Sequence, residues 1–266
     1  MAEAAGMYIY GRRPVEEALR REGRVQKVYV LHGSGVEESV RQAARRAHVP
    51  CVALDRQRFA QHVRALGVDI RSTQGVLALM APIPPATLER LVTGAPAGTI
   101  GLLVALDGIE DPQNLGAIAR CAEAAGAHGI VLPRHHSAPI TPAALKASAG
   151  ALASLPVAVV PNLAFALRTL QEQGWWVVGT APDGEHLYCE ELYDRPIVLV
   201  IGNEHRGMRP GIRSLCDIVV RIPLRGRVTS LNAAAATAVV LFEIQRQRYY
   251  REQLAVHSTE DPYVSD

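Results

Sequence analysis

The sequence has few aromatic residues and few cysteines, and each shortage excludes a class of protein. Aromatic residues make up 5% of the 266 residues and hydrophobic residues 48%, so the core must be aliphatic and rich in alanine. The cysteines form no C-x-x-C pair and have no histidine at ligand spacing, which argues against a disulfide framework and a metal site. We expect no metal, and we expect small buried thiols in a reducing compartment at Cys51, Cys121, Cys189 and Cys216.

Long apolar segments are also missing. No run approaches the length of a membrane span, and Met1 to Gly11 lacks the basic start and apolar stretch of a signal peptide. The sequence therefore predicts a cytoplasmic protein without a membrane partner.

The chain lacks the glycine-rich motifs of nucleotide-binding enzymes. No G-x-G-x-x-G follows an expected strand, and no G-x-x-x-x-G-K-[ST] occurs anywhere. The apolar run Thr99 to Leu106 continues instead into Asp107-Gly108-Ile109-Glu110-Asp111, where three carboxylates would repel a phosphate. These features argue against a nicotinamide-dependent dehydrogenase and a P-loop enzyme.

Charge is nearly balanced but unevenly distributed. The formal net charge is +2, whereas residues 1–80 carry 13 Lys and Arg against 8 Asp and Glu, a local balance of +5. A basic first third indicates an anionic polymer as a partner, although charge alone also fits an ordinary solvated surface.

The chain divides into two parts that both alternate strands and helices. Residues 81–98 are rich in Pro, Ala, Gly and Thr and predict an irregular linker between them. Residues 1–80 predict a small α/β module. Its expected strands are Tyr8–Tyr10, Val25–Leu31, Pro50–Leu54 and Gln74–Met80, and its expected helices are Pro14–Arg21, Val36–Ala47 and a third capped by Asp55.

Residues 99–266 predict a mostly parallel sheet covered by helices. Thr99 to Leu106 is a continuous apolar run, as expected of a strand buried on both faces. Asp111 and Pro112 are signals for a helix start, and a long alanine-rich helix is expected from Leu231 to about Arg251, capped by Ser230. The other expected strands are Gly129–Leu132, Leu155–Val160, Trp175–Thr180, Ile197–Ile201 and Ile218–Ile222, with a helix at Asn162–Gln173.

Polar residues gather in three short segments of this second part. The first runs from Asp107 to Arg120 and includes Asn114, the second is Gly202–Gly207 (GNEHRG), and the third is Ser230–Asn232 (SLN). Because the carboxyl ends of parallel strands form the usual ligand crevice of such a sheet, the segments indicate one binding site.

In this order, the three segments resemble the motifs of the SpoU/TrmH-type RNA 2′-O-ribose methyltransferases. The flanking stretches Lys146–Ala151, Gly174–Thr180 and Leu241–Arg248 are similar to the bacterial 23S rRNA guanosine-2′-O-methyltransferase branch. Tyr10–Val15 and Gln74–Val76 resemble that family's substrate-binding domain, so the resemblance covers nearly the whole chain.

The resemblance implies a fold, a cofactor and an assembly. The fold is α/β, with an RNA substrate-binding domain at residues 1–80 and a SPOUT-type methyltransferase domain at residues 99–266 that ends in a trefoil knot. The cofactor is S-adenosylmethionine, and the partner is structured RNA, 23S rRNA first. A homodimer that shares its active site is also implied, and the small apolar positions of the last helix favour such a partner.

The family pattern also assigns residues to the site. Attack of a ribose 2′-oxygen on a sulfonium methyl needs alignment and a route for the hydroxyl proton, but no metal. The implied catalytic residues are Asn114, Arg120, Glu204, Ser230 and Asn232. The implied cofactor-binding residues, which act through their backbone, are Thr180, Gly202, Ile222, Leu224 and Leu231.

The role of Arg120 leaves alternatives open. The family pattern assigns it to the 2′-hydroxyl, but a guanidinium stays protonated, so we favour polarising that hydroxyl or binding the neighbouring phosphate over acting as a base. The other residues also have ordinary structural interpretations, such as a turn at Asn114 or helix capping by Ser230 and Asn232.

Two positions depart from the family pattern. His205 stands where Gly is usual, which would strain the loop if that position needed a positive φ. Ala234 stands where a small polar residue is common, which removes one hydrogen bond.

Three functions are consistent with these observations. The first is methylation of a guanosine ribose in 23S rRNA. The second is ribose methylation of a tRNA or of an rRNA adenosine that confers antibiotic self-resistance. The third is a non-catalytic RNA-binding protein with the same fold, against which all five polar positions argue.

Overall fold

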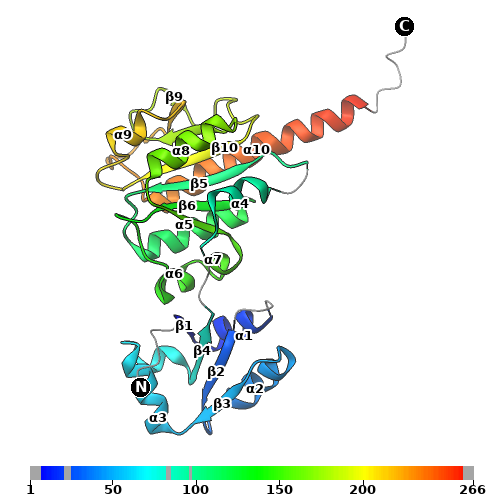
Figure 1. The fold of residues 1–266 in the computed structure, drawn as a ribbon, viewed down its shortest axis with the longest axis vertical. Helices are drawn as coiled ribbons and strands as arrows, with labels where there is room; N and C mark the ends of the chain where they lie inside the picture. The colour runs from blue at the N-terminus through cyan, green and yellow to red at the C-terminus, as the bar shows by residue number, and fades with distance from the viewer. Residues whose placement is uncertain (1–6, 21–24, 82–84, 96–97, 260–266) are drawn as a thin grey trace. The chain divides into compact units, whose positions relative to one another are not determined.

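A computed structural model describes residues 7–20, 25–81, 85–95 and 98–259. The chain forms two compact units, which Figure 1 shows in ribbon form. The first unit consists of residues 1–84 and 140–153, and the second of residues 85–139 and 154–266.

The first unit contains a four-stranded mixed sheet in the order β1-β4-β2-β3. Strand β2 pairs in parallel with β3 and antiparallel with β4, which also pairs antiparallel with β1. The predicted strands and helices of residues 1–80 are confirmed, with ends that shift by a few residues. Their bounds are β1 (Met7–Tyr10), α1 (Arg12–Arg20), β2 (Val25–Leu31), α2 (Glu37–Arg46), β3 (Cys51–Leu54), α3 (Arg56–Ala65), the 3₁₀ helix η1 (Ile70–Thr73) and β4 (Val76–Met80).

Both faces of this sheet are covered, because side chains alternate along each strand. Val28 and Val76 pack toward α1 and α2 on one face, whereas Tyr29 and Leu77 pack in a second cluster with Phe59 of α3. Two further helices, α6 (Pro142–Ala147) and α7 (Ala151–Ser154), follow much later in the chain. Helix α6 packs against β1, and the Lys146 ammonium lies 5.3 Å from the centre of the Tyr10 ring.

The segment predicted as an irregular linker, residues 81–98, contains a helix. Helix α4 (Leu88–Thr93) begins at Thr87, whose Oγ1 accepts a hydrogen bond from the Arg90 N–H. Leu91 is fully buried in the core of the second unit. The prediction of a structureless stretch is therefore wrong for these residues, because a cap and one buried apolar contact outweigh the flanking prolines and glycines. Residues 82–84 and 96–97 lie outside the described residues.

The second unit is built on a seven-stranded sheet in the order β7-β6-β5-β10-β8-β11-β9. Every strand pair is parallel, as predicted. The strands are β5 (Leu102–Asp107), β6 (Gly129–Pro133), β7 (Val157–Val160), β8 (Trp176–Thr180), β9 (His186–Leu187), β10 (Ile197–Gly202) and β11 (Ile218–Arg221). All six residues of β5 are buried, which explains the apolar run that precedes Asp107.

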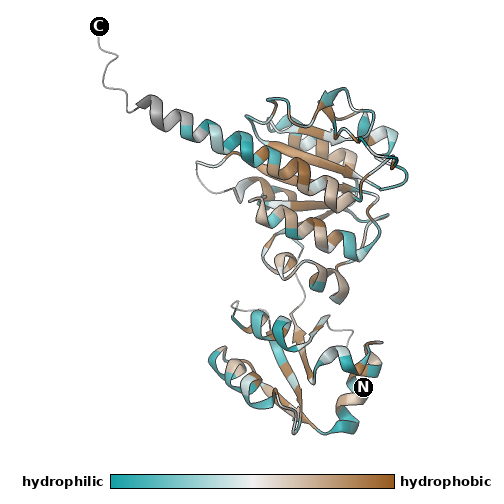
Figure 2. Ribbon diagram, turned by 180° about the vertical axis from the view of Figure 1, so that it is seen from behind, coloured by the Kyte–Doolittle hydropathy of each residue, from teal (hydrophilic) through white to brown (hydrophobic). Residues whose placement is uncertain are grey.

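Helices cover both faces of this sheet. Helices α4, α8 (Leu163–Glu172) and α9 (Pro210–Arg213) pack on one face, where Leu91, Leu167 and Ile212 belong to one buried cluster. Helices α5 (Pro112–Ala124) and α10 (Ala233–Thr259) lie side by side on the opposite face. Figure 2 shows this face turned toward the viewer. In the described part of the chain, no helix is both long enough and apolar enough to cross a membrane.

The start of the last helix differs from the prediction. The helix begins at Ala233, and its cap is Asn232, whose Oδ1 accepts hydrogen bonds from the N–H groups of Ala234 and Ala235. The assignment of Ser230 as the cap is therefore wrong. Asp111 does cap α5 as predicted, because its Oδ1 accepts a hydrogen bond from the Gln113 N–H at 2.8 Å.

The cysteines behave partly as expected. All four are free thiols, and Cys51, Cys121 and Cys216 are half-buried, but Cys189 is exposed and contradicts the prediction of buried side chains. Among the described residues, no group of three or more His, Cys, Asp or Glu side chains is placed to hold a metal ion.

Candidate active site

The carboxyl ends of β8, β10 and β11 surround a cavity of about 510 Å³ together with the first turn of α10. This volume is in the range of small-molecule sites. All five predicted cofactor-binding residues line the cavity: Thr180, Gly202, Ile222, Leu224 and Leu231. The sequence motifs thus converge on one hollow at the edge where parallel sheets bind ligands.

The lining combines apolar side chains with a few polar ones. Ile201, Val220 and Ile222 contribute apolar surface, while Glu204 and Ser230 contribute polar groups. The Thr180 hydroxyl donates to the carbonyl of Val200 at 3.2 Å, so this side chain is directed to the neighbouring strand. The backbone of Thr180 is what remains for a ligand.

Gly202 is required by a turn of the chain itself. A Cβ atom at this position would lie 2.4 Å from the carbonyl carbon of Gly207 and the nitrogen of Met208. Asn203 and Gly207 exchange two backbone hydrogen bonds, of 2.9 and 3.1 Å, which close the turn. The positive φ of the turn, 65°, falls at Gly207 and not at His205, so the departure at His205 causes no backbone strain.

Asn203 organises this turn, and the sequence analysis assigned it no role. Its Oδ1 accepts hydrogen bonds from the N–H groups of His205 and Arg206. Its Nδ2 donates to the carbonyl of Gly108 at 2.9 Å and so joins the second motif to the first. The amide inside the G-N-E segment was the available signal, because a side-chain amide has both an acceptor oxygen and a donor NH₂ group.

An ion pair joins Asp107 of the first motif to Arg209, which follows the second motif by two residues. Asp107 is 1% exposed and ends β5, and its carboxylate accepts hydrogen bonds from the backbone N–H and the Nε of Arg209, each at 2.7 Å. From the sequence, Asp107 was predicted as the start of the first polar segment and as one of three carboxylates that would repel a phosphate. A carboxylate that ends a fully apolar strand was the sequence signal for a buried partner.

Three of the predicted catalytic residues form a line of hydrogen bonds. The Asn232 Nδ2 donates to the Asn114 Oδ1 at 2.9 Å, across 118 residues of sequence. The Asn114 Nδ2 donates in turn to the Glu204 Oε1. One residue from each motif is therefore present in a single polar chain that ends at the cavity, since Glu204 lines it.

The remaining two catalytic candidates have different positions. Ser230 is exposed and lines the cavity. Arg120 is exposed on α5 and, within the described residues, has no hydrogen bond or ion pair to the other candidates. It follows Asn114 by six residues, which places it about 240° further around the helix. The single chain does not bring Arg120 together with Glu204.

Ala234, the second departure from the family pattern, is 8% exposed in the first turn of α10. Its backbone N–H donates to the Asn232 Oδ1, so the substitution leaves the line of polar contacts intact.

Cys216 contacts a residue of the cavity lining. Its sulfur lies 4.0 Å from that of Met208, and burial raises the pKa of the Cys216 thiol to about 12. Burial therefore disfavours the thiolate form that a cysteine nucleophile needs.

Two family patterns match the chain. The pattern of the SpoU rRNA Methylase family covers residues 101–242, and the pattern described as RNA 2′-O ribose methyltransferase substrate binding covers residues 8–86. The TrmH family tRNA/rRNA methyltransferase of Bacillus subtilis is 34% identical over 249 residues, which are 91% of this chain and 96% of that protein. The 23S rRNA (guanosine-2′-O-)-methyltransferase of Pseudomonas putida is 36% identical over 246 residues, 90% and 96% of the two chains.

Solved structures confirm the predicted fold class. The SpoU methyltransferase AviRb from Streptomyces viridochromogenes, in complex with the cofactor AdoMet, superposes with a TM-score of 0.77 at 26% identity, over 92% of this chain and 91% of that one. An AdoMet-bound rRNA methyltransferase from Sinorhizobium meliloti superposes with a TM-score of 0.73 at 28% identity, over 91% and 87%. The similarity extends through both units.

Proposed function

The chain belongs to the SpoU rRNA methylase family of RNA methyltransferases, and we propose that it methylates the ribose 2′-hydroxyl of a guanosine in 23S rRNA. The observation that carries this proposal is the polar line of Asn232, Asn114 and Glu204 beside the cavity. The similarity to the Pseudomonas putida enzyme supports guanosine as the methylated nucleotide and 23S rRNA as the substrate. We also propose that the protein binds this RNA in the cytoplasm.

The cofactor of the proposed reaction is S-adenosylmethionine. The cavity fits it, because its volume of about 510 Å³ and its apolar lining by Ile222, Leu224 and Leu231 suit an adenosine. The cofactor supplies an activated sulfonium methyl group. The protein then has two tasks. It must align the ribose oxygen, and it must take up the proton that this oxygen loses.

The polar line performs the first task. Asn232 and Asn114 orient the carboxylate of Glu204, because each amide donates to the next acceptor in the line. Glu204 and Ser230 both line the cavity, so a ribose hydroxyl that enters there can hydrogen-bond to either. Arg120 polarises the same hydroxyl or binds its phosphate through a planar two-pronged contact.

A homodimer would bring Arg120 to a cavity. Arg120 is exposed on α5, and the adjacent helix α10 exposes Val239 and Phe242 to 36% and 51%. Exposed apolar side chains on one helix face indicate a partner surface. We propose that a second copy packs on this face and that Arg120 of one copy serves the cavity of the other.

Replacing Phe242 with glutamate is expected to convert a dimer into a monomer, because the new charge would be buried at the interface. Light scattering at micromolar concentration measures the mass. Phe165→Glu is the matched control, since Phe165 is 69% exposed on α8, on the opposite face of the sheet, and its variant should stay dimeric. A monomeric wild-type protein, or a dimeric Phe242→Glu variant, would contradict the proposed interface.

The first unit is proposed to select the RNA. Its matched pattern is that of a substrate-binding domain, and many of its arginines are exposed. Phosphate contacts by such residues supply most of the affinity for RNA and weaken as salt rises. The exposed arginines of its helices are Arg12, Arg13, Arg20, Arg45, Arg46, Arg56, Arg58, Arg64 and Arg71.

Mapping of ribose methyl groups tests the proposed function. Total RNA from cells with and without the gene is digested and compared by mass spectrometry, and the purified protein is then offered 23S rRNA and tRNA transcripts. We expect one additional 2′-O-methylguanosine in 23S rRNA. A methyl group on tRNA or on an rRNA adenosine would favour the second candidate function, and no methyl group together with tight RNA binding would favour the third.

A further inference from the structure

Asp183 is a carboxylate on the cavity lining to which neither the motifs nor the proposed mechanism gives a role. It follows Thr180, the last residue of β8, by three positions and lines the cavity together with Arg213 of α9. The Arg213 Nη1 donates to the Asp183 Oδ1 at 2.8 Å. Both partners are partly exposed, at 74% for Asp183 and 38% for Arg213, so a ligand in the cavity can reach them.

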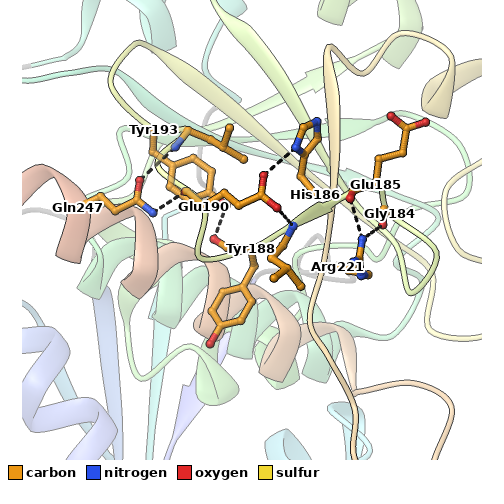
Figure 3. A network of polar contacts seen from close by, with 10 residues as sticks. Gly184, Glu185, His186, Tyr188, Glu190, Tyr193, Arg221 and Gln247 are labelled. Carbon is orange, nitrogen blue, oxygen red and sulfur yellow. Dashed lines mark hydrogen bonds and ion pairs between the residues drawn. The ribbon is translucent and has the colours of Figure 1, made fainter.

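The backbone that carries Asp183 is fixed on one side by Arg221 of β11. The Arg221 Nη1 donates to the carbonyls of Gly184 and Glu185 at 2.6 and 2.7 Å, as Figure 3 shows. A Cβ atom at Gly184 would lie 2.7 Å from the Val219 carbonyl oxygen, so the segment lies directly against β11. This close approach requires glycine next to Asp183.

The same segment is fixed on its other side by α10. Gln247 donates to the carbonyl of Glu190 at 2.7 Å and accepts from the Leu192 N–H, and the Glu190 carboxylate contacts His186 at 2.8 Å (Figure 3). The segment has little regular secondary structure, yet side chains of β11 and α10 anchor it. The backbone that follows Asp183 is therefore anchored, and the hydrogen bond from Arg213 orients the Asp183 carboxylate itself.

The charge of this pair restricts which ligand group it accepts. The hydrogen bond from Arg213 holds the pKa of Asp183 below its ordinary value, so the carboxylate is ionised at neutral pH and only accepts hydrogen bonds. The ion pair with Arg213 gives the two side chains no net charge together, so an uncharged ligand group can bind beside them and leave the pair intact. Two neighbouring hydroxyls are such a group, and each can donate a hydrogen bond to the carboxylate.

We propose that Asp183 recognises the ribose of the cofactor, its carboxylate accepting hydrogen bonds from the vicinal hydroxyls, with Arg213 as its positioning residue. The proposal rests on the proposed function, because it needs S-adenosylmethionine in this cavity. An acidic residue shortly after a strand end binds a ribose hydroxyl in the same way in dinucleotide-binding folds, which use a different topology.

Calorimetric binding tests this assignment without measuring turnover. The ligands are S-adenosylhomocysteine and its analogue that lacks both ribose hydroxyls. Wild-type protein should bind the analogue roughly 10- to 100-fold more weakly, the usual scale for hydrogen bonds to a charged group. Asp183→Ala should lose a similar factor for S-adenosylhomocysteine, while its affinity for the analogue should stay within about two-fold of wild type.

The control is Glu185→Ala, which removes an exposed carboxylate two positions after Asp183. The Glu185 side chain points away from the contacts drawn in Figure 3. It should bind both ligands like the wild type. A purely structural role for Asp183 would weaken both ligands equally in Asp183→Ala, and that result, or no change for either ligand, would overturn the assignment. Wild-type protein that bound no S-adenosylhomocysteine would overturn the proposed cofactor itself.

Discussion

Replacing Arg120 with alanine is expected to lower the rate of methyl transfer by roughly two to four orders of magnitude, the scale of a positioned electrostatic group. Cofactor affinity should stay within a few-fold of wild type, because the cavity is formed by the loops after β8, β10 and β11 and by α10. Arg120 lies on α5, outside this lining, so its loss should leave the cavity unchanged.

Single-turnover transfer of a tritiated methyl group to RNA measures this effect. Arg120→Lys should restore little activity, since a point charge cannot reproduce a planar fork of donors. Arg168→Ala, which removes an exposed arginine from α8 on the opposite face of the sheet, should transfer methyl groups at the wild-type rate. If Arg120→Ala did the same, the proposed role of Arg120 would be wrong.

Replacing Arg209 with methionine is expected to lower the free energy of unfolding by about 3–5 kcal/mol, the cost of leaving a buried charge without its partner. The Asp107 side chain is 0% exposed, whereas that of Arg209 is 53% exposed. Removing the arginine side chain therefore leaves a carboxylate that is buried in the wild-type protein and that, among the described residues, keeps the backbone N–H of residue 209 as its hydrogen-bond donor.

Urea unfolding monitored by circular dichroism checks the value. Adding Asp107→Asn to Arg209→Met should recover most of the loss, because a neutral amide oxygen can still accept from the same N–H. Arg206→Met is the control, since Arg206 is exposed in the same turn and should change stability by less than about 0.5 kcal/mol. Equal stability of the Arg206→Met and Arg209→Met variants would show that Asp107 does not depend on its ion pair.

Sequence patterns located the strands other than β9 and the starts of α2, α3, α5 and α8, because those features depend on neighbouring residues. The apolar run before Asp107 had to be a strand buried on both faces, and Asp111 before Pro112 had to begin a helix. Local signals predicted the wrong helix cap where the sequence offered two candidates. Ser230 and Asn232 are both good caps, and the path of the chain into α10 decided for Asn232.

The candidate site was predictable in its residue types but not in its connections. The motifs placed Asn114, Glu204 and Asn232 at strand ends, and the structure joins them by hydrogen bonds. Asp107 and Asn203 escaped notice because their importance lies in their partners, Arg209 and Gly108, which are about a hundred positions away in the sequence.

The sequence by itself determined the α/β class, the parallel sheet and the polar residues that face its carboxyl edge, because periodicity and capping act over a few residues. Only the tertiary structure decided that Asp107 is buried and pairs with Arg209 and that Asp183 lines the cavity and pairs with Arg213. A residue's burial and its hydrogen-bond partners depend on which distant segments the fold places beside it, and no local pattern contains that information.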